Sequence, residues 1–240
     1  MKVAVVVPAY NEAKAIQEVV RSIPRSIAGG HSTFVVVVDD GSSDSTSDEA
    51  RMAGADIVWK HNRNRGVGAS LRTGVRAAVR LGADIVCTLD ADGQLNPMEI
   101  PDVVNPILSG KADAVVGTRF NDVYSNSSIP MRNYILNVLL SVFLSVLLLR
   151  RLTDVCSGYR AFHVRTVPVL KIEDKWDTFS FILDIACAGY RLAEAPVSVK
   201  YFAGRKSRVV TNSLSFALMV LKGLILRTLP VPRKPQFVGR

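Results

Sequence analysis

The sequence predicts an α/β domain in which helices cover both faces of a mostly parallel sheet. In the first 120 residues, short apolar runs rich in Val and Ile alternate with amphipathic stretches of helical length. Strands and helices that alternate in this way form parallel sheets with right-handed crossover connections. The apolar runs carry almost no polar residues, which is typical of strands that are covered on both faces.

Turn-forming and polar residues bound each expected element. The expected strands cover residues 3–7, 34–38, 55–59, 85–89 and 112–116, and the expected helices cover residues 12–23, 43–53, 66–81 and 97–108. Pro8 ends the first strand, and we expect Ser43 or Asp44 to cap the second helix. Ligands of such sheets bind beyond the carboxyl ends of the strands, where the polar clusters of this sequence fall.

The second half of the chain contains two apolar stretches. The first has no charged residue at the 17 positions from 133 to 149. Polar side chains recur there every fourth residue, at Asn133, Asn137, Ser141 and Ser145. They would form a narrow stripe on a helix at about 131–151. A bilayer span needs about 20 apolar residues, so we expect this helix to be buried or to lie at a membrane interface.

The second apolar stretch, at 214–229, is interrupted by Lys222 and Arg227. We expect it to form a second helix at a membrane interface, because basic residues flank both stretches. The alternative is that both helices simply pack on the α/β domain.

Composition and charge limit the class of protein. A hydrophobic content of 48% is ordinary for a globular chain, and three cysteines without CxxC spacing favour a reducing compartment. The formal net charge is +9, and residues 121–240 carry 17 basic and 7 acidic side chains. This asymmetry suggests an anionic partner, namely nucleic acid, anionic lipid or a phosphorylated substrate; a solvated basic tail is the alternative.

The most specific pattern is Asp90-Ala91-Asp92-Gly93-Gln94, which directly follows the fourth expected strand. Alternate side chains of an extended segment point the same way, so both carboxylates can face one hard cation, and Gln94 offers a neutral oxygen. Mg²⁺ and Mn²⁺ take few protein carboxylates and complete their shell with water and phosphate oxygens. The pattern therefore predicts a Mg²⁺ or Mn²⁺ site shared with a diphosphate.

Two other polar clusters follow strands at the same predicted edge. Asp39 and Asp40 follow the second strand, where carboxylates can bind a ribose or a base; turn and cap formation is the alternative for Asp39 and Asp44. After the first strand, Tyr10 could stack on a base and Glu12 could accept a hydrogen bond from it, or Glu12 could merely favour a helix start. Residues 66–68 do not complete a Rossmann or P-loop motif.

These elements together resemble the family-two glycosyltransferases of the GT-A fold, and more closely their polyprenyl-phosphate sugar synthases of the dolichol-phosphate mannosyltransferase type. The matching segments are 7–12, 39–44, 90–94, 117–120 and 153–160. The resemblance implies a GT-A catalytic domain at 1–208 that includes the helix at 131–151, followed by a basic, apolar C-terminal helix and tail at 209–240.

The resemblance also implies roles for individual residues. Nucleotide-sugar donor contacts are expected from Pro8, Tyr10, Glu12, Val38, Asp40, Asp90, Ala91 and Asp92, and metal ligation is expected from Asp90, Asp92 and Gln94. Asp92, Arg119 and Arg132 are the expected catalytic residues. The acceptor phosphate is expected to contact Arg119, Arg132, Arg205 and Arg208. Phe202 departs from the family pattern, which often has an arginine there, so Arg205 is expected to supply that guanidinium.

The reaction that the resemblance implies is an inverting, metal-dependent transfer of a sugar from GDP-mannose or a UDP-sugar to a polyprenyl or dolichyl phosphate. An acceptor phosphate is already anionic near neutral pH, so no general base is expected. Asp154 is expected to orient another group or to form an ion pair with Arg160 or another arginine.

We expect the enzyme to lie on the cytoplasmic face of a membrane as a peripheral or monotopic protein and to bind no nucleic acid. The alternatives are a soluble family-two glycosyltransferase with a protein or polysaccharide acceptor, and a non-catalytic nucleotide-binding or nucleic-acid-binding module.

Overall fold

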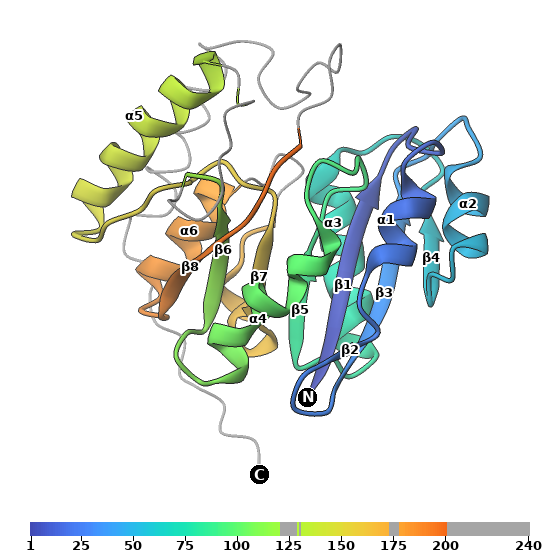
Figure 1. The fold of residues 1–240 in the computed structure, drawn as a ribbon, viewed down its shortest axis with the longest axis horizontal. Coiled ribbons are helices and arrows are strands. Elements are labelled where there is room, and N and C mark those ends of the chain that lie inside the picture. Colours follow the sequence, from blue (N-terminus) through green and yellow to red (C-terminus); the bar gives the residue numbers. More distant parts are fainter. Residues whose placement is uncertain (121–128, 130, 173–177, 201–240) are drawn as a thin grey trace. The chain divides into compact units, whose positions relative to one another are not determined.

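The computed structural model of the chain describes residues 1–120, 129, 131–172 and 178–200 (Figure 1). Its strands are β1 (Lys2–Ala9), β2 (Ser26–Ile27), β3 (His31–Asp39), β4 (Ile57–Lys60), β5 (Ile85–Thr88), β6 (Ala114–Thr118), β7 (Arg160–His163) and β8 (Leu192–Pro196). Its α-helices are α1 (Ile16–Ser22), α2 (Thr46–Met52), α3 (Val67–Arg80), α4 (Ile100–Leu108), α5 (Met131–Leu147) and α6 (Thr178–Cys187). Two 3₁₀ helices span Pro97–Glu99 and Val164–Val169.

The strands form one mixed sheet with the order β2-β3-β1-β5-β7-β6-β8, and β4 also pairs with β3. β1, β3, β4 and β5 run parallel to one another, and β6 runs parallel to β8. β7 is antiparallel to both of its neighbours, β5 and β6. The five expected strands are confirmed, whereas β2, β7 and β8 were not expected. The expectation of a mostly parallel sheet therefore misses the antiparallel strand at its centre.

Helices cover both faces of the sheet, as the sequence predicts. Buried residues of α1, α2 and α4 share one core with alternate residues of the strands, such as Val5 and Val37. On the opposite face α3 lies against β1 and β3, and a Cβ added at Gly74 of α3 would overlap the Val6 side chain. The rings of Phe162 and Phe181 lie 5.6 Å apart and join β7 to α6 on that face.

The polar side chains that recur every fourth residue of α5 attach this helix to the loop 152–155. Asn137 and Ser141 are buried, and both donate hydrogen bonds to the carbonyl oxygen of Thr153, at 2.9 and 3.2 Å. Ser145 accepts a hydrogen bond from the backbone amide of Leu152 at 2.9 Å. The four-residue spacing of these side chains therefore serves to fasten α5 to the loop 152–155.

The opposite side of α5 is apolar and exposed. Its exposed side chains include Ile135, Leu139, Val142, Phe143 and Val146. In the described part of the chain, no helix is both long enough and apolar enough to cross a membrane. The expected second apolar helix, at 214–229, lies outside the described residues.

Candidate functional site

The candidate site lies at the sheet edge where the carboxyl ends of β1, β3, β5 and β6 meet. These strands point the same way because β6 and β5 are both antiparallel to β7. The segments that follow them carry Glu12, Asp40, Asp90 and Arg119. β7 starts at this same edge with Arg160, since it runs in the opposite direction. The sheet thus gathers at one edge the polar clusters that the sequence analysis singled out.

Asp90 lies among charges of both signs. Burial of its carboxyl group and the negative charge of Asp92 raise the pKa of Asp90 to about 6. The positive charges of Arg160 and Arg119 oppose this rise, and the buried carboxylate of Glu12 adds to it. Asp92 therefore acts on Asp90, as the sequence spacing predicts, and the charges of Arg160 and Arg119 partly offset its effect on Asp90.

The loop after Asp90 turns sharply at Gly93, whose φ of 73° lies in the left-handed region that favours glycine. The turn lets the Gln94 amide donate a hydrogen bond to Asp92 Oδ1 at 3.0 Å. The Gln94 carbonyl accepts a hydrogen bond from the amide of Lys200 at 2.8 Å, which ties this loop to the segment after β8. Asp92 is consequently held in a short, internally bonded turn.

The donor set fits a divalent cation that also binds a ligand. Two neighbouring carboxylates on a bonded turn are hard oxygen donors, and a cation between them would relieve their mutual repulsion. Among the described residues, no three His, Cys, Asp or Glu side chains come together as a metal-binding group. A cation held by Asp90 and Asp92 would therefore need further oxygen ligands, such as water or phosphate.

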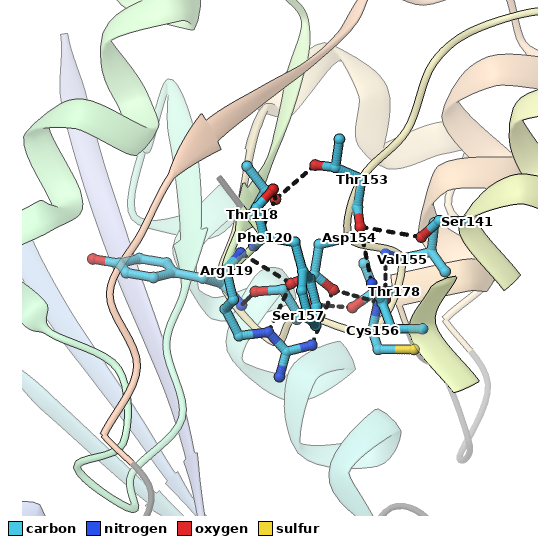
Figure 2. Close-up of polar contacts among 12 residues, drawn as sticks. Thr118, Arg119, Phe120, Ser141, Thr153, Asp154, Val155, Cys156, Ser157 and Thr178 are labelled. Atoms are coloured by element: carbon cyan, nitrogen blue, oxygen red, sulfur yellow. Dashed lines mark hydrogen bonds and ion pairs between the residues drawn. The ribbon is translucent and has the colours of Figure 1, made fainter. Parts of the chain in front are cut away.

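Arg119 and Asp154 form a buried ion pair at the end of β6 (Figure 2). Arg119 Nε and Nη2 donate hydrogen bonds to the two carboxylate oxygens of Asp154, at 2.7 and 2.9 Å, and the Arg119 amide donates a third at 3.1 Å. Asp154 is fully buried, and the Arg119 side chain is 15% exposed. The expectation that Asp154 pairs with an arginine is confirmed, and that arginine is Arg119.

The loop that carries Asp154 is itself fixed on two sides. Glu194 of β8 accepts hydrogen bonds from the amides of Thr153 and Asp154, at 2.8 and 3.1 Å. Thr118 and Thr153 share a hydroxyl hydrogen bond of 2.7 Å, and Ser141 of α5 reaches the Thr153 carbonyl (Figure 2). The position of Arg119 thus depends on β6, β8 and α5 together.

Asp40 is buried and makes its contacts within the protein. Its carboxylate accepts hydrogen bonds from the amides of Arg65 and Gly66, which precede α3, and lies 2.7 Å from Nδ1 of His61. These contacts organise the loop 61–66 at the candidate site. The role of His61 was not foreseen, because nothing in its sequence surroundings indicates the partner 21 residues away.

Asp39 and Asp44 have the structural roles that were the alternative for them. Asp39 Oδ1 accepts a hydrogen bond from the Ser42 amide at 2.8 Å, and Asp39 Oδ2 accepts one from the Ser47 hydroxyl. Asp44 accepts a hydrogen bond from the Thr46 amide at 3.1 Å at the start of α2, whose N-cap residue is Ser45. The expectation that Ser43 or Asp44 caps this helix is therefore wrong, since Ser45 is the N-cap residue and makes no side-chain cap hydrogen bond.

The remaining expected donor contacts differ in accessibility. Tyr10 is exposed at the end of β1, and Pro8 is partly buried. Val38 and Ala91 are buried, so a donor contact from either would have to come from its main chain.

Of the residues expected at the acceptor phosphate, Arg119 is the one whose side chain belongs to the described part of the structure. The main chain of Arg132 belongs to the first turn of α5, and its side chain lies outside the described part of the structure. Arg205, Arg208 and Phe202 also lie outside it.

Arg160 is the main charged residue of the site that the residue predictions left out. It is buried, its guanidinium carbon lies 5.9 Å from the centre of the Phe181 ring, and its charge acts on Asp90. Arg160 belongs to the segment 153–160, which matches the family pattern, and this match is the sequence feature that could have identified it. Its position beside Asp90 follows only from the antiparallel pairing of β7 with β5.

Known proteins resemble the chain in sequence over most of its length. The family model for glycosyl transferase family 2 matches residues 4–167. A UDP-N-acetylglucosamine–dolichyl-phosphate N-acetylglucosaminyltransferase of Methanococcus voltae is 30% identical and aligns over 90% of this chain and 94% of its own. An undecaprenyl-phosphate mannosyltransferase of Micrococcus luteus is 27% identical over 82% of this chain and 83% of its own.

A solved structure shares the fold. Glucosyl-3-phosphoglycerate synthase of Mycobacterium tuberculosis, crystallised with Mn²⁺, UDP and phosphoglyceric acid, superposes with a TM-score of 0.71. The match covers 96% of this chain and 80% of that one, at 22% sequence identity. The expected GT-A-like architecture, a sheet flanked by helices, is thereby confirmed.

Proposed function

The chain belongs to glycosyltransferase family 2, and we propose that it transfers a sugar from a nucleotide-sugar to a polyprenyl phosphate at a membrane surface. The observation that carries the proposal is the double role of the loop 152–155. Through Asp154 this loop holds Arg119 at the candidate site, and through Thr153 it holds α5, whose other side is apolar and exposed. The loop 152–155 therefore holds in place both a cationic group that could bind a phosphate and an apolar surface that could contact lipid.

The acidic loop is the proposed donor site. Asp90, Asp92 and Gln94 would hold a Mg²⁺ or Mn²⁺ ion, which when bound would neutralise negative charge on the departing nucleoside diphosphate. The related fold of the mycobacterial synthase was crystallised with Mn²⁺ and UDP, which supports a similar pairing here. Pro8, Tyr10, Glu12 and the main chain near Val38 are proposed to contact the nucleoside along the same edge, and Asp40 would act by ordering the loop 61–66.

Arg119 is the proposed contact for the acceptor phosphate. Its pairing with Asp154 fixes the guanidinium before substrate binds, so little side-chain freedom remains to be lost in the complex. Arg132, Arg205 and Arg208 are proposed to join it and to hold two anionic substrates together against their repulsion. A phosphate oxygen needs no deprotonation near neutral pH, so it can attack the anomeric carbon directly and invert its configuration.

The membrane is the proposed location of the acceptor. Exposed apolar patches of more than a few hundred Å² are rare on monomeric soluble proteins, and α5 exposes apolar side chains along its whole length. Arg151 follows α5 and can meet anionic headgroups, contributing about 1 kcal/mol, whereas the guanidinium of Arg150 donates a hydrogen bond to the Leu192 carbonyl of β8. We therefore assign residues 1–208 to a catalytic domain and 209–240 to a basic appendage, peripheral or monotopic on the cytoplasmic face.

The names of two relatives support the donors that we propose. One relative is named for UDP-N-acetylglucosamine and another for mannose transfer. We propose that the donor is a UDP-sugar or GDP-mannose.

The test is a transfer assay with purified protein, Mn²⁺, polyprenyl phosphate in anionic vesicles and a panel of radiolabelled nucleotide-sugars. Label should move into organic solvent for one donor of the panel, and a chelator should abolish the transfer. Asp92→Ala should remove activity while the protein stays folded, and Asp102→Ala, a change on the exposed side of α4, is the matched control. Label that stays in water on a soluble phosphorylated, protein or polysaccharide acceptor would refute the lipid acceptor and favour a soluble transferase.

A further inference from the structure

Gly158 lies directly against the Asp90 carboxylate. A Cβ atom added to Gly158 would lie 3.0 Å from Asp90 Cγ and 3.1 Å from Oδ1, and it would overlap Oδ2. The φ angle of Gly158 lies outside the left-handed region, so φ does not require a glycine at this position. What excludes a side chain at position 158 is therefore the space that the carboxylate occupies.

The backbone around Gly158 is held firmly. Thr88 donates a hydrogen bond to the Gly158 carbonyl at 3.0 Å, and the Thr178 hydroxyl donates one to the Ser157 carbonyl. Tyr159 is fully buried, and its carbonyl accepts a hydrogen bond from the Gly117 amide at 2.8 Å. A side chain at position 158 would consequently displace the Asp90 carboxylate rather than the backbone.

The same segment also supports the far end of the acidic loop. The Tyr159 hydroxyl donates a hydrogen bond at 3.1 Å to the carbonyl of Asn96, two residues beyond Gln94. Gly158 therefore bounds Asp90 at the start of the loop, and Tyr159 fixes its end. The loop between them contains Asp92 and the turn at Gly93.

We propose that Gly158 is a positioning residue, which sets where the Asp90 carboxylate stands relative to Asp92 by leaving no alternative space for it. The part of this inference that concerns metal binding rests on the proposed function, because that function includes the metal site. Groups that orient a metal ligand without touching the metal typically change affinity by about 10- to 100-fold when they are altered. We expect Gly158→Ala to weaken Mn²⁺ binding by at least about tenfold.

A double-mutant cycle tests the contact itself without any metal. The Tm of wild type, Gly158→Ala, Asp90→Ala and the double variant is measured in the presence of a chelator. The Gly158→Ala change should lower Tm clearly in the wild-type background and much less when Asp90 is alanine. If Gly158→Ala alone fails to fold, recovery of folding in the double variant supports the proposal in the same way. An equal loss in both backgrounds would overturn it.

Mn²⁺ binding, followed by the electron paramagnetic resonance signal of the free ion, tests the consequence. Asp102→Ala is the control, because its side chain lies on the exposed side of α4 and the change adds no atom near Asp90. The control should bind Mn²⁺ as wild type does, whereas a folded Gly158→Ala protein with wild-type affinity would overturn the positioning role. Wild-type protein that binds no Mn²⁺ would refute the metal site of the proposed function instead, and the Tm cycle would then decide on the contact.

Discussion

Replacing Asp154 with asparagine should lower the free energy of unfolding, because Arg119 would lose its charge partner. The carboxylate of Asp154 is fully buried and accepts two charged hydrogen bonds, at 2.7 and 2.9 Å, and two from main-chain amides. Removing one partner of a buried ion pair costs about 3–5 kcal/mol, because the other charge stays buried. For a chain of this size, 3 kcal/mol lowers Tm by about 6–12 °C.

The measurement is urea unfolding of wild type and Asp154→Asn, with the free energy of unfolding extrapolated to water. The matched control is Asp48→Asn, which removes the ion pair of Asp48 and Arg51 at a similar distance of 2.9 Å. These side chains are 75% and 53% exposed, so the control should lose less than about 1 kcal/mol. Asp154→Asn should also reduce sugar transfer by about 100-fold, since a displacement of about 1 Å has that effect.

The reasoning fails if Asp154→Asn and the control lose the same stability, because burial would then not set the strength of the pair. It also fails if transfer is unchanged while stability falls. In that case Asp154 would support the fold and have no part in placing Arg119.

Three further predictions concern other parts of the molecule. Gly74→Ala should destabilise the protein by about 1–3 kcal/mol in urea unfolding, despite the better helix propensity of alanine, because the added methyl group overlaps Val6. Hydrogen bonds from Arg191 hold the pKa of Asp113 well below its ordinary 3.8. This stabilisation is complete above that ordinary value and is lost as the pH falls below it, so Asp113→Asn should cost stability at pH 6 and much less at pH 2. Leu139→Glu on the outer side of α5, at a side chain 64% exposed, should reduce sedimentation with anionic vesicles without lowering Tm; unchanged sedimentation would refute the membrane role of α5.

The sequence alone predicts the part of the site that is local. Periodic apolar runs identify β1, β3 and β5, and the parallel arrangement places whatever follows them at one edge. The closeness of Asp90 and Asp92 follows from the spacing of two residues in one turn. The polar stripe of α5 was likewise visible as a four-residue period, although its partner, the loop 152–155, was not.

The contacts between distant segments were decided by the tertiary structure. Arg119 and Asp154 are 35 residues apart, and they meet because Glu194 and α5 hold the loop 152–155 beside the end of β6. Gly158 meets Asp90 because β7 enters the sheet antiparallel to β5, a pairing that the local pattern of residues 160–163 does not encode.

The sequence by itself thus determined β1, β3, β4, β5 and β6, the helices α1 to α5 and the sheet edge where the polar clusters lie, because hydrophobic periodicity is a property of neighbouring residues. Only the tertiary structure decided which arginine pairs with Asp154 and which main-chain amides bond to the Asp40 carboxylate. It also decided that Gly158 packs against the Asp90 carboxylate. Those pairings depend on the order and direction of strands in the sheet, which the packing of the whole domain selects.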